Sequence, residues 1–475
     1  MRPLARRPLR PVARLCAGVA ALVALVAPFA ADAQPLPAAP PSRVAAPPPP
    51  GFGSADDLFE RGSGGDDTDG AAVALFGGVA YLPDTWRGAV RGEVEASSGP
   101  VSAAAAATLH PAAGGLYGPE SDELYDVVRA VAYVRLNPAA GQPVYARLGP
   151  TERLTLGAGA LARAYRTTTA WDERTLGAEA SVETRRFAAA AFADDVRLGG
   201  VVGGQAEVRT PLGIGPRAGL RLAGLRLSVG AVHDLGLPSR GDSSLTGVEA
   251  TLRGDVAGGR FAAEAPFGLS PFVTAARYLG HGSTFGAGAD LDLFRSSTAL
   301  RAHVRAAVFV STTRFVPGHV GPFYAVSNAG ERIVADAAGQ VFLGTPLDSL
   351  RSGVDVVFDV RLLAFGRFEV SQHIRRHVGA DRASAYGVRL AARLPRRARA
   401  ELAVERQGFR GLWSFVRGLG DENALVLDVA APVGRVAQAF VRSRYGYRRL
   451  DAAGPGRFLV ERRFEPLVGV RVDLR

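Results

Sequence analysis

The chain has 475 residues and a formal net charge of +11, from 56 basic and 45 acidic side chains. Every basic residue is an arginine, and the arginines are spread along the chain rather than clustered with aromatic residues on one element, which excludes a nucleic-acid-binding protein. Beyond the N-terminus no segment reaches 18 uninterrupted apolar residues, so membrane-spanning helices are excluded as well.

Residues 1–33 have the pattern of a secretory signal peptide. Five arginines lie within the first 14 residues, an apolar run covers 15–30, and the small residues at positions 31 and 33 suit cleavage before Gln34. The apolar run is shorter than the ~20 residues of a membrane anchor. The single cysteine, Cys16, belongs to this segment, so we expect a mature chain with no disulfide and no thiolate metal site.

Residues 34–70 are predicted to be a disordered linker. Proline runs at 35–50 favour extended conformations, and the stretch 62–70 is rich in Gly, Asp and Ser. The apolar stretch 71–82 that follows is predicted to be either a first strand or a segment tucked into the mouth of the fold.

The remainder, 71–475, is dominated by two-residue alternation, which indicates strands with one apolar and one polar face. The clearest hairpin is 388–404, where Leu390 and Leu402 share the apolar parity and a tight turn lies at 395–397. The chain also ends on such a strand, at 468–474. Other predicted strands are 89–96, 101–109, 127–136, 154–165, 175–184, 187–194, 201–209, 225–231, 244–255, 268–278, 285–294, 301–310, a hairpin over 352–378, 424–431 and 436–448.

Repetition of this pattern over 71–475 in a secreted chain predicts an all-β protein, namely a transmembrane antiparallel up-and-down β-barrel in the outer membrane of a Gram-negative cell. Single-chain bacterial barrels favour even strand numbers, and we expect about 16 strands, with about 14 and about 18 as the alternatives. A propeller would show a sequence repeat and a large sandwich would show a domain break, and neither is present. The longest loop, 313–350, is expected either to face outward or to fold into the lumen.

The chain resembles porin-like outer-membrane β-barrel proteins of a poorly characterised family. The segments Tyr145–Gly149, Leu154–Gly159 and Leu176–Glu179 are similar to strands of such barrels, although this chain ends on Leu474-Arg475 where many barrels end on an aromatic residue. The resemblance implies outer-membrane lipid, the barrel-assembly machinery and small solutes as partners. The oligomeric state is left open.

The polar parity of these strands carries the candidate site residues. Rings of arginine in a pore favour anions. The alternative is that the arginines pair with Glu401, Glu405, Asp473, Asp355 and Asp359 in a closed lumen. The lumen-facing candidates are Arg301, Arg305, Arg389, Arg393, Arg399, Glu401, Glu405, Arg471 and Asp473.

We therefore expect a porin-like channel or substrate-selective transporter for small solutes. The alternatives are a closed structural or assembly barrel that anchors a surface complex, and an outer-membrane hydrolase. The hydrolase lacks support because no nucleophile elbow, His-Glu-x-x-His helix or phosphate-binding loop is present, although His233 and Asp234 form a possible pair. His373 and His377 are too far apart on a strand to share a metal ion. No catalytic residue, metal or cofactor is predicted.

Overall fold

The computed structural model describes the chain from Gly70 to Leu474, and the predicted signal peptide and most of the predicted linker lie outside the described residues. Within this span the description omits 83–84, 113–114, 118–124, 137–143, 152–153, 170–174, 185, 198–199, 215–219, 236–244, 259–266, 294–298, 325–351, 366–367, 379–383, 394–397, 410–422 and 450–457.

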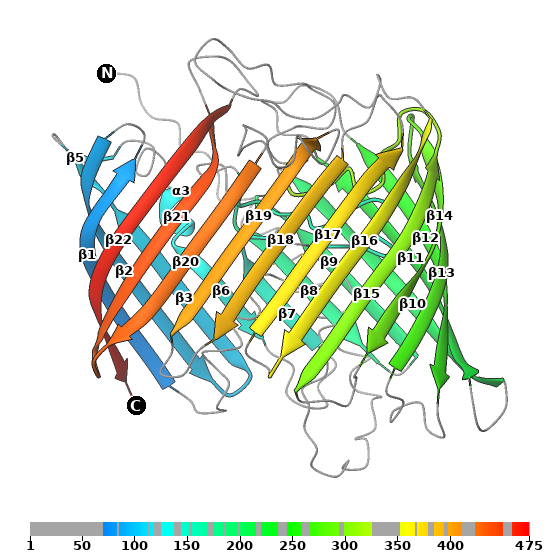
Figure 1. Cartoon of the computed structure of the whole chain (residues 1–475), viewed down its shortest axis with the longest axis horizontal. Coiled ribbons are helices and arrows are strands. Elements are labelled where there is room, and N and C mark those ends of the chain that lie inside the picture. The colour runs from blue at the N-terminus through cyan, green and yellow to red at the C-terminus, as the bar shows by residue number, and fades with distance from the viewer. Residues whose placement is uncertain are drawn as a thin grey trace, which may run out of the picture.

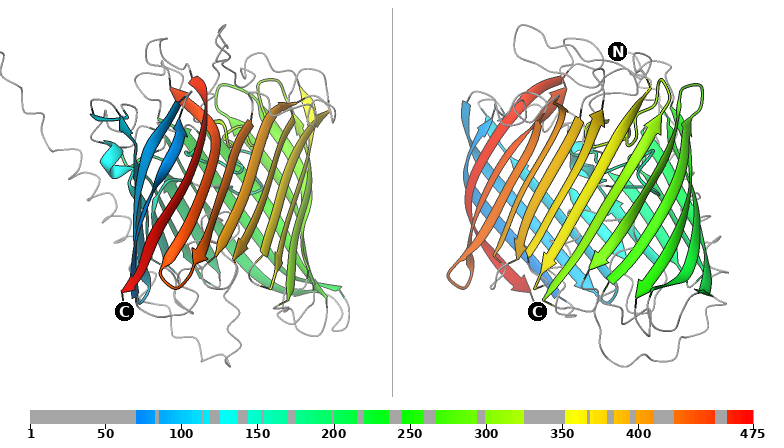
Figure 2. Two further views of the ribbon diagram at one scale, coloured as in Figure 1. Left: turned by 60° about the vertical axis from the view of Figure 1, so that its left-hand side comes forward. Right: turned by 45° about the vertical axis from the view of Figure 1, so that its right-hand side comes forward.

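The described residues form one closed antiparallel barrel of 20 strands (Figures 1 and 2). Each strand pairs with its neighbours in chain order, and β1 closes the ring by pairing with β22 through Val73 opposite Val472. A short hairpin, β4 (Pro111–Ala112) with β5 (Gly115–Leu116), and one turn of helix, α3 (Tyr125–Val128), lie between barrel strands. The barrel strands are β1 (Gly70–Leu82), β2 (Thr85–Ser98), β3 (Val101–Leu109), β6 (Val131–Leu136), β7 (Val144–Gly149), β8 (Gly177–Glu183), β9 (Phe187–Ala193), β10 (Val201–Ile214), β11 (Leu220–Asp234), β12 (Thr246–Gly258), β13 (Phe267–Tyr278), β14 (Ser283–Leu293), β15 (Leu300–Ser311), β16 (Gly353–Ala364), β17 (Phe368–Val378), β18 (Ser384–Arg393), β19 (Arg399–Phe409), β20 (Asn423–Val433), β21 (Ala437–Arg449) and β22 (Phe458–Leu474).

The expected strand number of about sixteen is wrong, because the barrel has 20 strands. Every individually predicted segment except 154–165 overlaps a barrel strand, so the expected number was lower than these segments support. The structure adds two strands to them: β1, the stretch 71–82 that the sequence left open, and the six-residue β7, which contains the strand-like segment Tyr145–Gly149. The predicted strand at 154–165 is also wrong, because this segment lies inside the barrel and belongs to no barrel strand.

Alternate side chains separate an outer from an inner face of the barrel wall, most clearly on β13 and β15. On β13, Val273 and Ala275 are exposed, whereas Phe272 and Thr274 between them are buried. We call the face with exposed apolar side chains the outer face and the opposite one the inner face. An apolar outer face with a polar inner one is the arrangement of transmembrane barrels, whose closed ladder leaves no backbone edge exposed to lipid.

The two ends of the barrel differ in their connections. Short turns such as 98–101, 364–368 and 433–437 lie at the end that also holds the start of β1 and the end of β22. The opposite end carries the long connections 109–131, 149–177 and 311–353. In outer-membrane barrels the short turns face the periplasm and the long loops face outward. None of the helices in the described residues has the length and apolar composition needed to cross a membrane.

Candidate functional site

The connection from β7 to β8 folds into the barrel instead of outward. We call its described residues 150–169 inner segment A. Gly157 and Gly159 adopt positive φ angles of 53° and 80°, which a strand does not allow and glycine adopts without strain. Leu154 and Tyr165 then pair across the resulting turn, with N···O distances of 2.8 and 2.9 Å. These turns explain why residues 154–165 do not form a barrel strand although their sequence alternates between apolar and polar residues.

A buried carboxylate on the barrel wall holds inner segment A. Glu249 on the inner face of β12 accepts the backbone N–H of Ala158 at 2.7 Å and that of Leu161 at 3.2 Å. The hydroxyls of Thr251 and Thr274 donate to the same carboxylate, each at 3.2 Å. These four hydrogen bonds compensate the cost of burying the carboxylate. They also fix inner segment A to the barrel wall.

The connection that contains the predicted long loop starts with three exposed residues at 312–314, and its next described residues, 315–324, fold into the interior; we call 315–324 inner segment B. Of the two positions that the sequence left open for 313–350, these residues take the inward one, while 325–350 lie outside the described residues. The backbones of segments A and B hydrogen-bond to each other, with Arg163 N–H donating to Val320 at 3.0 Å and Gly318 N–H donating to Ala160 at 2.8 Å. The two segments therefore form one unit across the lumen.

Apolar packing fixes this unit against one side of the barrel. Leu161 and Phe315 belong to a buried cluster with wall residues from β9 to β16, including Phe272 and Phe309. The ring of Phe315 stacks on Tyr278 of β13 with a centroid distance of 4.6 Å. This side of the lumen is packed like a protein core.

Segment A also reaches the opposite wall through charged side chains. Arg163 donates a hydrogen bond to Asp359 on β16, and the guanidinium of Arg166 lies 3.9 Å from Glu405 on β19. The backbone N–H of Tyr447 on β21 donates to Thr169 at 3.2 Å. The segment therefore spans the lumen from β12 to β21.

Several of the sequence-predicted residues form ion pairs on the inner face. Arg389 Nε donates to Glu401 across the β18–β19 ladder at 2.6 Å. Arg471 on β22 donates to Glu95 on β2 at 2.9 Å and to Asp473 at 3.4 Å. These arginines are brought together with acids rather than gathered into a ring of uncompensated positive charge.

The other predicted arginines follow the same pattern where their side chains are described. Arg305 is buried on β15 and donates to Asp290 on β14 at 2.5 Å. The guanidinium of Arg399 lies 3.9 Å from Glu93 on β2. Arg301 is partly buried, and the side chain of Arg393 lies outside the described ones.

Among the lumen-facing candidates, Glu405 contacts inner segment A through Arg166. It pairs with His373 Nε2 at 3.0 Å in addition to Arg166. Its pairing with an arginine of the inward connection could not be read from strand patterns, which say nothing of where a loop folds.

The residues that fix the inner segments were missed by sequence reasoning. Gln205 on β10 accepts the backbone N–H of Gly157 at 2.7 Å, beside the contacts of Glu249 on β12. In the sequence, both residues look like ordinary inner-face residues of a strand. The available signal was the spacing of Gly157 and Gly159, because two glycines at alternate positions interrupt an otherwise regular strand pattern.

The candidate hydrolase pair is not supported by its geometry. His233 Nδ1 contacts the Thr246 hydroxyl at 2.8 Å, whereas Asp234 accepts a hydrogen bond from Tyr324 of inner segment B at 2.8 Å. The two side chains thus have separate partners, and Asp234 serves to hold segment B. Among the described residues, no group of three or more His, Cys, Asp or Glu side chains is placed to bind a metal ion.

No protein-family model and no curated protein matches the sequence. Similar solved structures include OpdL of Pseudomonas aeruginosa, with 12% identity, coverage of 86% of this chain and 100% of that chain, and a TM-score of 0.31. Another is Wzi, an outer membrane protein of Escherichia coli involved in group 1 capsule assembly and described as a carbohydrate-binding β-barrel, with 10% identity, coverage of 87% and 86%, and a TM-score of 0.36. OccAB3 of Acinetobacter baumannii has 10% identity, coverage of 86% and 100%, and a TM-score of 0.24. On the evidence of its closed ladder, apolar outer face and charged inner wall, the chain is an outer-membrane β-barrel.

Proposed function

We propose that this barrel is a channel for small polar solutes, narrowed by inner segments A and B. A barrel of this strand number encloses a wide lumen unless something fills it. The segments pack against the side formed by β9 to β16 and reach the other wall at a few points, which leaves the charged wall of β16 to β22 to line the passage.

The observation that carries this proposal is the exposure of charged side chains on the inner face. Arg361 on β16 and Arg399 on β19 keep 39% and 36% of their side-chain surface accessible, and Arg444 on β21 keeps 23%. Since the barrel is closed and its outer face is apolar, this surface is reached by water from within. A fully packed structural barrel would bury these groups.

We assign the lining of the passage to the paired charges of this wall that stay partly exposed, including Arg399, Glu401, Arg471 and Asp473, whereas Arg389 is buried behind Glu401. Because each of these arginines has an acid beside it, the fixed field of the wall is small, and the passage should discriminate by size more than by charge.

Liposome swelling tests the proposal. Liposomes that contain the folded mature barrel should swell in an isotonic monosaccharide and much more slowly in a trisaccharide, since the passage is constricted. Protein shown to be folded by its altered gel migration before heating, yet giving no swelling with any sugar, would support the closed structural barrel instead.

A further inference from the structure

A groove of about 560 Å³ opens on the outer face of the barrel, outside the lumen, across β11 to β15. Strand register explains its shape. One row of directly opposed outer-face residues runs Val229, Ala250, Ala275, Phe285 and Val310. Two alanines in the middle of the row lie between larger side chains, so the surface is hollowed there.

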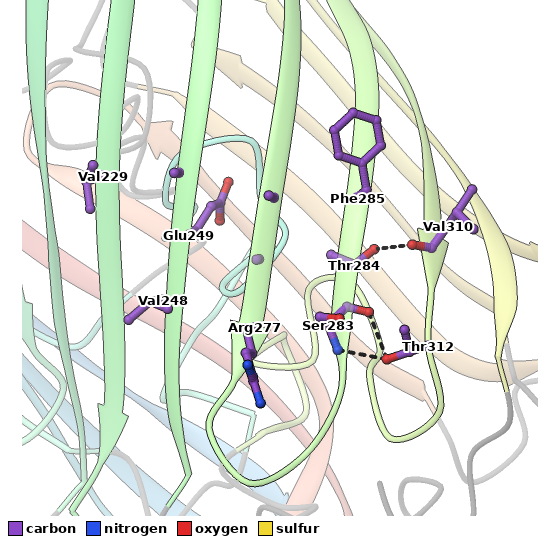
Figure 3. A pocket seen from close by; sticks show the side chains of 12 residues that line it. Val229, Val248, Glu249, Arg277, Ser283, Thr284, Phe285, Val310 and Thr312 are labelled. Carbon is purple, nitrogen blue, oxygen red and sulfur yellow. Dashed lines mark hydrogen bonds between the residues drawn. The ribbon is translucent and has the colours of Figure 1, made fainter.

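The side chains that bound the groove are apolar on both flanks (Figure 3). Val229 and Val248 lie on one side of it, and Phe285 and Val310 lie on the other. Val229, Phe285 and Val310 are all more than half exposed, although each is a large hydrophobic residue. Their exposure is compatible with contact to lipid acyl chains and not with water.

A single cation marks one end of the groove. Arg277 is opposite Val248 on β12 and Ser283 on β14, in the row next to the alanines on the side of the long connections. It is exposed on the outer face, and no described acidic side chain pairs with it. An arginine at this level of a barrel lies near the headgroups of the outer leaflet.

We infer that this groove binds a phosphate-bearing lipid of the outer leaflet, with one acyl chain over Ala250 and Ala275 and the phosphate on Arg277. Guanidinium groups pair with phosphate through two parallel hydrogen bonds, which fixes orientation as well as charge. Packing of the chain against Val229, Phe285 and Val310 adds van der Waals contacts, since neither surface is in water before the lipid binds. The site is independent of any solute passage, because it lies on the other side of the barrel wall.

Native mass spectrometry of the detergent-purified mature barrel tests this inference, with bisphosphorylated lipid A as the probe and fully dephosphorylated lipid A and inorganic phosphate as comparisons. We expect the bisphosphorylated lipid to be retained as a single adduct, at least five-fold more than the dephosphorylated lipid, and inorganic phosphate not to be retained. Equal retention of both lipids would show that only apolar contact operates, and retention of inorganic phosphate would show that the arginine binds a free anion. Either result overturns the inference.

Three variants separate the two halves of the site. Arg277→Gln removes the cation, and Ala250→Leu fills the groove, so each should lower lipid retention at least five-fold. Ala287→Leu is the matched control, because Ala287 lies on the same outer face of β14 and outside the groove lining. Folding of each variant is checked by its migration before and after heating. Unchanged retention in folded Arg277→Gln or folded Ala250→Leu would refute the site.

Discussion

At the residue scale, Asp428 on β20 compensates two arginines of the inner wall. Arg442 Nε donates to Asp428 at 3.0 Å, and the guanidinium of Arg444 lies 3.5 Å from it. Arg442 keeps a second acid, Glu465, at 3.8 Å, so loss of Asp428 should leave the barrel folded.

We expect Asp428→Asn to shift ion selectivity toward anions. The change leaves positive charge uncompensated beside the passage, which should raise the anion-to-cation permeability ratio about twofold at low salt and less at high salt. The measurement is the reversal potential of single channels in a salt gradient. Asp126→Asn is the control, since Asp126 lies on α3 and pairs with Arg129 directly after that helix, away from this wall. A reversal potential that moves equally in both variants would show that Asp428 on β20 does not line the passage.

His319 in inner segment B gives the structure a sensitivity to acid. Burial, together with the charges of Arg375 and His281, lowers the pKa of His319 to about 3, from an ordinary value of 6.5. Its ring packs between Tyr278 and Tyr324. Because the unfolded chain takes up the proton first, the stability contributed by neutral His319 is complete above about pH 6.5 and is lost as the pH falls toward 3.

Thermal unfolding between pH 7.5 and 4.5 measures this contribution. His319→Phe keeps the aromatic packing and removes the titration, so its unfolding temperature should fall less on acidification than that of the unmodified protein. Parallel curves for the two proteins would show that His319 is not buried as a neutral group.

At the scale of elements, the barrel strands follow from sequence because each needs only local alternation. The hairpin of β18 and β19 and the final strand β22 have strong apolar alternation, and both were predicted in the right place but too short. The predicted hairpin 388–404 lies within Ser384–Phe409, and the predicted strand 468–474 is only the last part of β22, Phe458–Leu474. Inner segment A carries the same alternation, with Leu154, Leu156 and Ala158 on one parity. It does not join the ladder, because Gly157 and Gly159 turn it and Glu249, far away in sequence, captures its backbone. Long-range capture of this kind leaves no periodic signal.

Glu249→Ala should release inner segment A from the wall. The change leaves the N–H groups of Ala158 and Leu161 without their acceptor, at a cost of about 1–3 kcal/mol for each buried group. We expect trypsin to cleave after Arg163 or Arg166 about tenfold faster, since local opening sets the rate of cleavage.

The matched control for this experiment is Glu207→Ala. Glu207 is an acid of β10, two strands away from β12, and it accepts a hydrogen bond from Arg209 at 2.6 Å rather than from the segment. Equal trypsin sensitivity in both variants would mean that Glu249 does not hold the segment.

At the scale of the whole molecule, the interior formed by the described residues holds two apolar clusters and a set of partly exposed ion pairs. The second cluster lies on the inner faces of β1, β2 and β20 to β22, around Phe76 and Phe440. Segments A and B join the wall of β9 to β16 through an apolar cluster, and the wall of β16 to β22 keeps partly exposed ion pairs. The passage that we propose lies between the inner segments and the ion pairs, so its width should depend on the inner segments rather than on the strand number.

Single-channel conductance in planar bilayers tests this account most directly. Because Leu154 and Tyr165 are paired, residues 155–164 can be replaced by two glycines that join the paired ends without moving β7 or β8. We predict small, stable channels for the unmodified barrel and a conductance at least about threefold larger for the shortened one, with the outer-face variant Ala287→Leu unchanged. Equal conductance in the unmodified and shortened barrels, or none from either folded protein, would contradict a passage constricted by inner segment A.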